Sequence, residues 1–322
     1  MALVSFCIPA RNASAYIEMT LRSILDQTYC ELEVIVIDDH SEDNTVAIIK
    51  QFSDTRLKLH LASKYGASAA RNEAYRLAKG KYIIFFDADD WIPADFLESQ
   101  MKTLKSEDDV VLSTWGRFVN GDIRTFVSAS SEILEEMTFK KWIIKYWSTN
   151  TNMTCPGRVL SPKKVIEKTG LWDESLTLND DFPFFTSVFL NAKKININNK
   201  SNFYYRSGVG GLSSLNSNLG LDSLYRSIVL AIECLPSDYF HDEKIKKSCA
   251  NLLQSFVYKS YPRVKKSRKK AELQIKAFGG ADLLHDAGGL TAKFNYIFGW
   301  KCTKIIKNKV KNLKHLFKKT TR

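Results

Sequence analysis

The chain has 322 residues, of which 44% are hydrophobic and 25% are charged, and its formal net charge is +12. This composition is ordinary for a globular protein with one large α/β domain and an appendage. Residues 241–322 hold 21 Lys and Arg against 5 Asp and Glu, whereas residues 1–240 hold 26 against 30, and so acidic a core argues against a protein whose main body binds nucleic acid.

Short apolar runs and amphipathic segments alternate over the first 105 residues. Strands are predicted at Leu3–Ile8 (stopped by Pro9), Glu33–Ile37, Leu57–Leu61 and Tyr82–Phe86. Helices are predicted from Ser14, after a cap at Ser41, between Gly66 and Gly80, and around Pro93 as a first-turn residue. This alternation predicts an α/β protein with a doubly wound, mostly parallel sheet.

The pattern is looser beyond residue 105. We predict a strand at Val110–Trp115, a polar hairpin or loop at 116–135, helices at Thr138–Trp147, from Ser161 and Pro162, and from Asp180, a mobile loop at 207–220, and helices over 221–260. The change in composition predicts two domains, 1–220 with the sheet and 221–322 as a helical, basic C-terminal region.

Two of the predicted strands run directly into acidic residues. Asp38 and Asp39 follow the second strand, and Asp87, Asp89 and Asp90 follow the fourth. Because parallel strands share one carboxyl edge, both sets should meet there, where open α/β sheets bind ligands. Clustered carboxylates repel one another unless a cation lies between them, and oxygen ligands suit Mg²⁺ or Mn²⁺. A solvated acidic turn is the simpler interpretation of the second set.

Five short elements match a family pattern in order over roughly residues 3 to 215. They are Pro9-Ala10-Arg11-Asn12, Ile37-Asp38-Asp39-His40-Ser41, Gly66 with Ala70-Arg71-Asn72, Phe86-Asp87-Ala88-Asp89-Asp90, and Asn179-Asp180-Asp181 after Gly170-Leu171-Trp172. In these elements the chain resembles the inverting, GT-A-fold family 2 glycosyltransferases that build bacterial polysaccharides. Arg11 departs from the Tyr that many members have there, and Asp180 departs from a frequent Glu.

The resemblance implies how a nucleotide sugar is bound. Pro9, Arg11, Asp39 and Arg71 would contact the nucleotide, with the Asp39 carboxylate accepting a hydrogen bond from the base and the Arg71 guanidinium lying over the nucleotide. For the neighbouring Asp38, a loop or helix-cap carboxylate is the simpler interpretation.

The remaining family positions would handle the diphosphate and the acceptor. Asp87 would face the ribose, and Asp89 would hold a divalent cation, Mn²⁺ or Mg²⁺. Arg206 would clamp the diphosphate, although an exposed arginine without that duty is an equal alternative. Asp181, with Asp180 as second choice, would be the general base; the alternative is that the pair caps a helix. Trp172 either stacks on sugar or packs in the core.

The implied function is a metal-dependent, inverting transfer of a sugar from a nucleoside diphosphate sugar, UDP-linked by expectation, to a hydroxyl of a saccharide or lipid-linked saccharide. A sugar-phosphate nucleotidyltransferase on a similar sheet is the main alternative. The Asp-x-Asp phosphatases fit less well because Asp90 and Trp91 follow the motif. A receiver domain is much shorter than this core. A non-enzymatic basic binder of membranes or nucleic acid remains as another class.

The C-terminal tail is basic and amphipathic. Residues from Lys301 to Arg322 include nine basic and no acidic side chains, and apolar residues recur at steps of three or four, namely Cys302, Ile306, Val310, Leu313 and Phe317. Aromatic residues lie just upstream, from Phe294 to Trp300. We expect this segment to bind an anionic membrane surface, unless the stripe packs on the domain. Nucleic acid is not an expected partner.

Other features favour a cytoplasmic protein, which the tail would make peripheral on the inner face of the membrane. No uninterrupted apolar stretch approaches the length of a transmembrane helix, and the amino terminus lacks the pattern of a signal peptide. The six cysteines are scattered without a C-x-x-C pair, which fits reduced thiols better than a disulfide framework or a zinc site.

Overall fold

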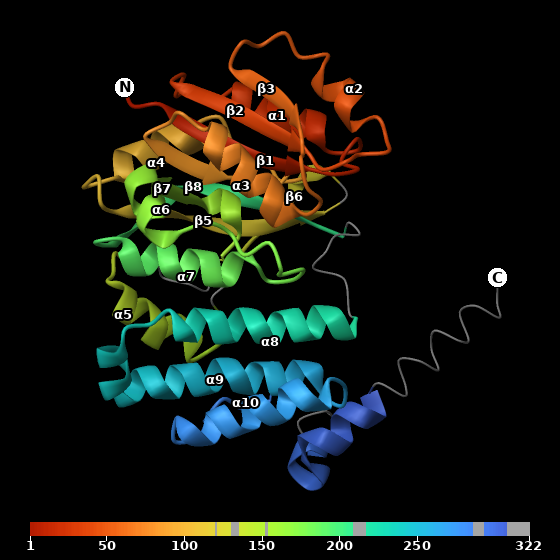
Figure 1. Ribbon diagram of the computed structural model, residues 1–322, viewed down its shortest axis with the longest axis vertical. Helices are drawn as coiled ribbons and strands as arrows, with labels where there is room; N and C mark the ends of the chain where they lie inside the picture. Colours follow the sequence, from red (N-terminus) through yellow and green to blue (C-terminus); the bar gives the residue numbers. More distant parts are fainter. Residues whose placement is uncertain (120, 130–134, 152–153, 209–216, 286–292, 308–322) are drawn as a thin grey trace, which may run out of the picture. The chain divides into compact units, whose positions relative to one another are not determined.

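The structure is a computed structural model of the chain that describes residues 1–119, 121–129, 135–151, 154–208, 217–285 and 293–307 (Figure 1). The chain forms two compact units. The sheet unit comprises Met1–Trp142, Met153–Leu215 and Val229–Leu235, and the helical unit comprises Ile143–Asn152, Asn216–Ile228 and Pro236–Arg322. The domain boundary at residue 220 stays a prediction.

The sheet unit is built on an eight-stranded sheet. Its strands are β1 Val4–Ala10, β2 Leu32–Asp38, β3 Leu57–Leu61, β4 Tyr82–Phe85, β5 Val110–Val119, β6 Asp122–Ser128, β7 Val159–Pro162 and β8 Ile195–Ser207. The order is β3-β2-β1-β4-β7-β5-β6, with β8 paired to β5. Strands β3, β2, β1 and β4 are parallel, as are β5 and β8, while β7 and β6 are antiparallel to their neighbours. The predicted mostly parallel α/β sheet is confirmed.

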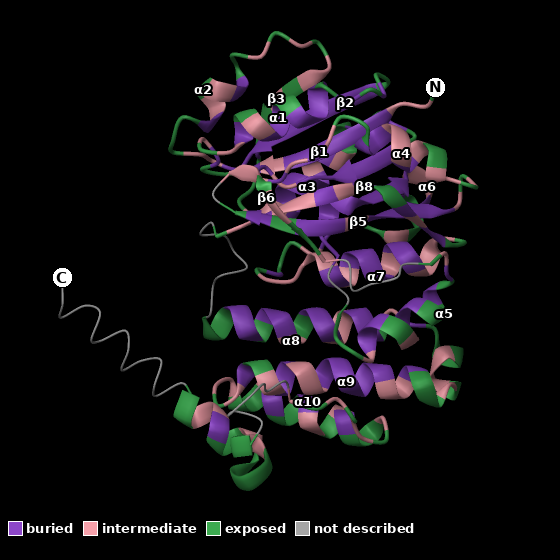
Figure 2. Cartoon of the chain, turned by 180° about the vertical axis from the view of Figure 1, so that it is seen from behind, coloured by how far each residue is buried: buried purple, intermediate pink, exposed green. Residues whose placement is uncertain are grey.

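The helices cover apolar strands. They are α1 Ile17–Leu25, α2 Thr45–Ile49, α3 Ala67–Leu77, α4 Phe96–Thr103, α5 Phe139–Trp142, α6 Lys163–Thr169 and α7 Asp181–Asn191. Every residue of β2 and of β4 is buried, as expected for strands covered on both faces (Figure 2). Helix α1 buries Ile17, Leu21, Ile24 and Leu25, at the predicted helical spacing.

Pro9 does not stop the first strand, contrary to the prediction. Strand β1 continues through Pro9 to Ala10, and its pairing with β4 ends earlier, at Cys7 and Phe85. The Cys7 carbonyl accepts from Phe86 on the β4 side, and the Ala10 carbonyl accepts from Asp39 on the β2 side. By alternation Pro9 faces the β4 side beyond the last paired residue, so its missing N–H removes no hydrogen bond from the ladder.

Three predicted helix starts are shifted. Helix α2 begins at Thr45, and the Ser41 hydroxyl accepts a hydrogen bond from the Asn12 N–H instead of capping the helix. Helix α4 begins at Phe96, so Pro93 precedes its first turn. Pro162 ends β7 and is the N-cap of α6, so the helix begins at Lys163, one residue later than predicted. In each case short polar or proline signals were correct about a boundary but not about its exact position.

The second half is more regular than predicted. Strand β5 extends past Trp115 to Val119 and pairs with the antiparallel strand β6. Of the two predictions for 116–135, the hairpin is therefore the one that the structure shows. The predicted Thr138–Trp147 helix is α5 followed by a π-helical turn, Ile143–Trp147. Of the loop predicted at 207–220, residues 209–216 lie outside the described part of the chain, and the prediction is wrong for Asn218–Gly220, which begin α8.

The helical unit confirms the helices predicted after residue 220. It contains most of α8 Asn218–Glu233, with α9 Glu243–Ser260, α10 Lys265–Ala277 and a helix over 293–307. Helix α9 is the centre, and it buries a continuous face that includes Ile245, Leu252, Leu253 and Phe256 (Figure 2). No helix in the described ranges is long and apolar enough to cross a membrane.

A tight contact behind the acidic edge gives a stability prediction. A Cβ atom at Gly157 would lie 2.4 Å from Cε2 of Phe203 and 2.8 Å from Cδ2 of Phe86. We expect Gly157→Ala to lower the free energy of unfolding by about 1–3 kcal/mol through overpacking. Urea denaturation measures it. The control is the same change combined with Phe203→Leu, where the smaller ring-free side chain should reduce the cost; equal costs in both backgrounds would contradict this contact.

Candidate active site

The loops that follow β1, β2 and β4 meet at one edge of the sheet. Ala10 pairs with Asp38 and Cys7 with Phe85, so the residues that come next in the three loops are neighbours. The predicted convergence of the two acidic sets at one carboxyl edge is therefore confirmed. The loop after β1 lies between them, because β1 is the middle strand of the three.

Hydrogen bonds join the first two loops. The Asn12 N–H donates to the Ser41 hydroxyl (2.9 Å), and the Glu42 N–H donates to the Asn12 side-chain oxygen (2.9 Å). Asn12 has a φ of 48° and His40 a φ of 58°, a left-handed conformation that Asn and His tolerate better than most residues. These contacts hold the loop after β1 beside the loop after β2.

Asp39 lies at the centre of this pair of loops. Its two carboxylate oxygens accept the Gly66 N–H at 3.0 and 3.1 Å, and Gly66 has a φ of 113° that favours glycine. The Arg11 guanidinium lies 3.7 Å from Asp39, and the His40 Nδ1 atom lies 3.3 Å from it. Asp38 is buried next to it and accepts the Ser41 N–H, as the loop-carboxylate interpretation predicted.

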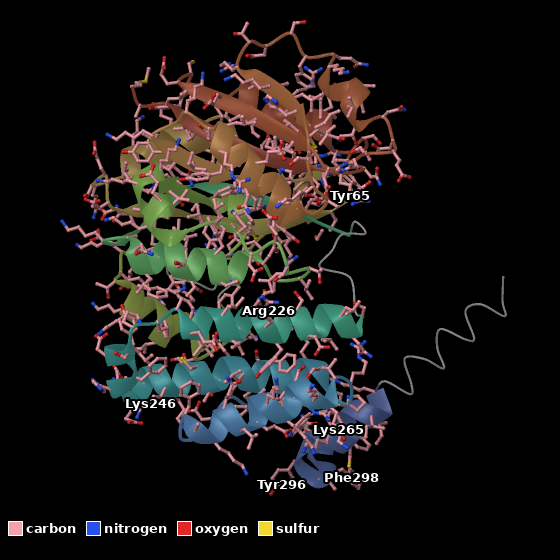
Figure 3. The ribbon with its side chains drawn as sticks, viewed as in Figure 1. Tyr65, Arg226, Lys246, Lys265, Tyr296 and Phe298 are labelled. Atoms are coloured by element: carbon pink, nitrogen blue, oxygen red, sulfur yellow. The ribbon has the colours of Figure 1, made fainter. Side chains whose placement is uncertain are left out.

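An aromatic pair stands beside Asp39. The rings of His40 and Tyr65 stack with their centroids 3.9 Å apart, and the Arg11 guanidinium lies 5.6 Å from the Tyr65 centroid. Tyr65 is exposed at the surface of the sheet unit (Figure 3). The three side chains provide a flat, partly cationic surface next to a carboxylate.

Arg71 joins two acidic segments that are far apart in the chain. Its Nη2 atom donates to Asp87 (2.7 Å) and its Nη1 atom donates to Asp180 (2.8 Å), while its guanidinium lies 4.5 Å from the Trp172 centroid. Ser68 adds a 2.7 Å hydrogen bond to Asp180. Arg71 is only 7% exposed, and although burial acts to lower its pKa, the two carboxylates hold that pKa above its ordinary value. A direct contact with nucleotide stays a prediction for Arg71.

Asn72, the next residue of α3, fixes the segment before α7. Its side-chain oxygen accepts the Trp172 N–H (2.9 Å), and its side-chain nitrogen donates to the Trp172 carbonyl (3.0 Å) and to Glu174 (3.0 Å). Trp172 is buried and stacks on Phe184 with the ring centroids 4.2 Å apart. Trp172 therefore packs in the core and does not present a face to sugar.

Asp180 and Asp181, the two candidates for the general base, lie in different environments. The Asp180 side chain does not cap α7; it is held by Arg71 and Ser68. Burial, reinforced by the charge of Asp180, raises the pKa of Asp181 to about 7, and Arg71 opposes this shift. A pKa of about 7 suits Asp181 to accept a proton near neutral pH.

Arg206 lies behind the second acidic set. Its backbone N–H donates to Asp90 (2.8 Å), its Nε atom donates to the Asp89 carbonyl, and its guanidinium lies over Tyr16 and Phe118. Arg206 is only 3% exposed, so the alternative of an exposed arginine without a duty is wrong. Its predicted role as a diphosphate clamp stays a prediction, because these contacts are with the protein.

The charges around Asp89 fit a cation that also takes ligands from a substrate. Burial and the charge of Asp87 raise the pKa of Asp89 to about 6, and one oxygen of the buried Asp90 has no hydrogen-bond partner. Among the residues that the structure describes, no three His, Cys, Asp or Glu side chains converge as a metal cluster. Mg²⁺ and Mn²⁺ in diphosphate sites commonly take one or two carboxylates and complete their shell with phosphate oxygens.

Sequence reasoning missed three contributors. The Asn72 clasp spans 100 residues, and although Asn72 belongs to a matched element, nothing local in its sequence indicates what it holds. His40 has no role in the sequence interpretation above, yet it flanks Asp39 and stacks on Tyr65. The sequence shows Gly66 only as a glycine in a loop and gives no sign of its hydrogen bond to Asp39.

A profile of the family described as Glycosyl transferase family 2 matches residues 5–170. Over 105 residues the chain is 45% identical to the UDP-Glc:alpha-D-GlcNAc-diphosphoundecaprenol beta-1,3-glucosyltransferase WfgD of Escherichia coli, which covers 32% of this chain and only 41% of that relative. It is 30% identical over 219 residues to the enzyme of the same description named WfaP, also of Escherichia coli, covering 66% of this chain and 81% of WfaP.

Solved structures agree with the sheet. The TarS 1–349 fragment of S. aureus, solved in complex with UDP-GlcNAc, superimposes with a TM-score of 0.64 at 20% identity, covering 86% of this chain and 88% of that one. Similarity at this identity concerns the fold, and it confirms the GT-A fold with a helical C-terminal region that the sequence predicted.

The Arg71 bridge gives a second prediction. Arg71→Met leaves Asp87 and Asp180 without their shared partner, and we expect the free energy of unfolding to fall by about 3 kcal/mol. Arg71→Lys, which keeps the charge but not the two-armed geometry, should lose less. Urea denaturation of both variants and of Arg71→Met with Asp180→Asn measures the coupling. Additive effects in the double variant would contradict the bridge.

Proposed function

The chain belongs to glycosyl transferase family 2, and from this premise we propose a metal-dependent, inverting transfer of a sugar from a UDP-linked donor to a hydroxyl of a saccharide or lipid-linked saccharide. The observation that carries the proposal is the Arg71 bridge, which holds Asp87 and Asp180 together. Asp181 follows Asp180 directly and has a pKa of about 7. One site thus combines carboxylates for a donor with a group able to take a proton.

The nucleotide would bind over the loops after β1 and β2. A carboxylate has about four acceptor positions, so Asp39 can hold the Gly66 N–H and still accept the imide N–H of uracil. Arg11 stands where many family members have Tyr, and together with Tyr65 it offers a flat surface to the base. Pro9 would contribute by directing the backbone of this edge.

The diphosphate would lie near the second acidic set. Asp89 is the residue that would hold a divalent cation, Mn²⁺ or Mg²⁺, with Asp87 directed to the ribose. Such a cation supplies Lewis-acid stabilisation of the charge on the leaving diphosphate. Arg206 would then orient Asp89 and Asp90, because it already donates hydrogen bonds to the Asp89 carbonyl and to the Asp90 side chain.

Asp181 would act as the general base. The acceptor oxygen forms a bond to the anomeric carbon while the bond from that carbon to the diphosphate oxygen breaks. The carboxylate of Asp181 takes the hydroxyl proton, and the leaving nucleoside diphosphate keeps the bonding electron pair. Attack from the side opposite the leaving group inverts the anomeric centre in a single step.

The acceptor class follows from the relatives. WfgD and WfaP are described as acting on alpha-D-GlcNAc-diphosphoundecaprenol, a saccharide linked to a membrane lipid. We extend a lipid-linked acceptor to this chain, with the enzyme at the inner, anionic surface of the membrane. The excess of basic residues after residue 240 supports that location, since each Lys or Arg near an anionic surface adds about 1 kcal/mol.

One assay separates this function from the sugar-phosphate nucleotidyltransferase. A panel of sugar nucleotides is incubated with the enzyme, with and without Mn²⁺ or Mg²⁺, and the released product is identified. Metal-dependent release of nucleoside diphosphate supports sugar transfer. Release of pyrophosphate from a sugar phosphate and a nucleoside triphosphate supports the alternative and refutes the proposal.

Asp181→Asn should separate catalysis from stability. We expect turnover to fall by about a hundredfold to ten-thousandfold, because the base is lost, while donor binding is retained. The wild-type rate should rise as the pH passes about 7, where Asp181 loses its proton. Since the folded-state pKa is raised from 3.8, ionised Asp181 costs stability. Asp181→Asn should therefore be more stable than wild type above pH 7 and no more stable below about pH 4.

Thermal denaturation across this pH range and initial rates measure both effects. Asp180→Asn is the matched control, because it changes the neighbouring carboxylate that Arg71 already holds. Normal turnover in Asp181→Asn together with loss of turnover in Asp180→Asn would transfer the role of base to Asp180.

Asp89→Asn should remove metal-supported binding and spare the fold. Wild-type protein should bind UDP more tightly with Mn²⁺ than with EDTA, whereas Asp89→Asn should bind UDP equally in both. Isothermal titration measures the affinities. Asp181→Asn is the control, and it should still bind UDP more tightly with Mn²⁺ than with EDTA. If Asp89→Asn also bound UDP more tightly with Mn²⁺, Asp89 would be excluded as the metal ligand.

A further inference from the structure

We propose that the exposed apolar side chains of the 293–307 helix insert into an anionic lipid surface while its lysines contact lipid phosphates. We call these side chains the apolar ridge, and they are Phe294, Ile297, Phe298, Cys302 and Ile306. The inference rests on the lipid-linked acceptor of the proposed function and identifies the surface that would bring the enzyme to it.

Phe294, Ile297 and Phe298 recur at steps of three or four before Gly299, whose φ is 73°, and Cys302 and Ile306 lie four residues apart after it, so each set shares one side of its own part of the helix. All are exposed, with fractions of 45% for Phe294, 68% for Ile297, 56% for Phe298 and 48% for Ile306. The alternative that the predicted stripe packs on the domain is thus wrong for its two described members, Cys302 and Ile306. The stripe residues Val310, Leu313 and Phe317 lie outside the described residues.

The other side of the same helix is fixed to α9. Trp300 packs edge-on against Tyr258 and Tyr261, with ring centroids 4.8 and 5.2 Å away, and it stacks on His285. The Lys304 ammonium donates to the carbonyls of Tyr258 and Lys259, where α9 ends. Trp300 therefore serves as an anchor and not as the membrane-facing aromatic that the sequence suggested. The side chains of the ridge remain exposed beside these anchoring contacts.

The exposed lysines near the ridge favour an anionic lipid surface as its partner. Lys293, Lys301 and Lys307 are exposed on the same helix, and the exposed side chains of α10 include Lys265, Lys266, Lys269 and Lys270. Figure 3 shows Tyr296, Phe298 and Lys265 at the surface of this unit. A basic surface next to apolar side chains is complementary to a bilayer with anionic headgroups.

Other occupants fit the ridge less well. Single-stranded nucleic acid would stack on aromatic faces, but Ile297, Cys302 and Ile306 have no π-face. A second copy of this chain would bring another strongly basic unit against the first, and like charges oppose that contact. A bilayer accepts aliphatic and aromatic side chains equally and adds attraction for lysine.

The test is co-sedimentation of the full chain with phosphatidylglycerol or phosphatidylcholine vesicles. We expect binding to the anionic vesicles that weakens with salt. Ile297→Asp should reduce that binding by about tenfold or more, because an apolar side chain no longer leaves water. The matched control is Leu273→Asp on α10, in the same unit, at 67% exposure and with the same change of charge. It should bind nearly as wild type.

Equal losses in the two variants would show that charge alone drives binding and would overturn the ridge. Equal binding to neutral vesicles would overturn the role of lysine. A wild-type dimer in the absence of lipid that Ile297→Asp dissociates would assign the ridge to a second copy instead. Circular dichroism checks the fold of each variant, and Phe298→Ser provides a second ridge variant that should also lose binding.

A labelling experiment reads the insertion directly. Cys302 lies on the ridge and Cys30 is the exposed cysteine of the sheet unit. A polarity-sensitive dye on Cys302, in a Cys30→Ser background, should shift to the blue when anionic vesicles are added. The same dye on Cys30, in a Cys302→Ser background, should not shift, and equal shifts would overturn the proposal. These readouts need no substrate, so they fail or succeed independently of nucleoside diphosphate release.

Discussion

The two-armed ion pair of Arg71 is the interaction on which the site depends. Three carboxylates, Asp87, Asp180 and Asp181, belong to two loops separated by more than 90 residues of chain, and their mutual repulsion opposes this arrangement. A single buried guanidinium satisfies one carboxylate from each loop. The planar fork of arginine has the geometry for two directions at once, which a lysine lacks. The loop after β4 and the start of α7 are thereby set relative to each other through one side chain.

The site carries more negative charge than it neutralises within the protein. Arg71 satisfies Asp87 and Asp180, and Arg206 contacts the Asp89–Asp90 segment, yet the pKa values of Asp89 and Asp181 remain raised. Raised carboxylate pKa values mean that the ionised forms are less stable in the folded chain than in water. This is the pattern expected where function needs a poised proton acceptor and a group able to bind a cation.

How far the sequence predicts this protein depends on the range of the interaction. The strands, their parallel arrangement and the acidic edge follow from apolar runs and their neighbours, so the sequence alone predicts Asp39 and Asp87 at one edge of the sheet. The Asn72 clasp on Trp172 and the Arg206 contact with Asp90 join residues 100 and 116 positions apart, and no local pattern encodes them. Pro9 was wrong as a strand end because a missing N–H matters only where a partner strand is present, which the sequence does not show.

The two proposed ligands of this chain carry negative charge in different forms. A nucleoside diphosphate is compact, so it requires groups at fixed positions, and in the sheet unit Arg11 and Arg71 are each held by a carboxylate. A membrane is diffuse and laterally fluid, so it requires total charge and apolar area more than position. The helical unit has that composition, with many exposed lysines and an apolar ridge. Because the excess of basic over acidic residues lies after residue 240, the acidic residues before it are not outnumbered by lysine and arginine side chains that would repel a cation.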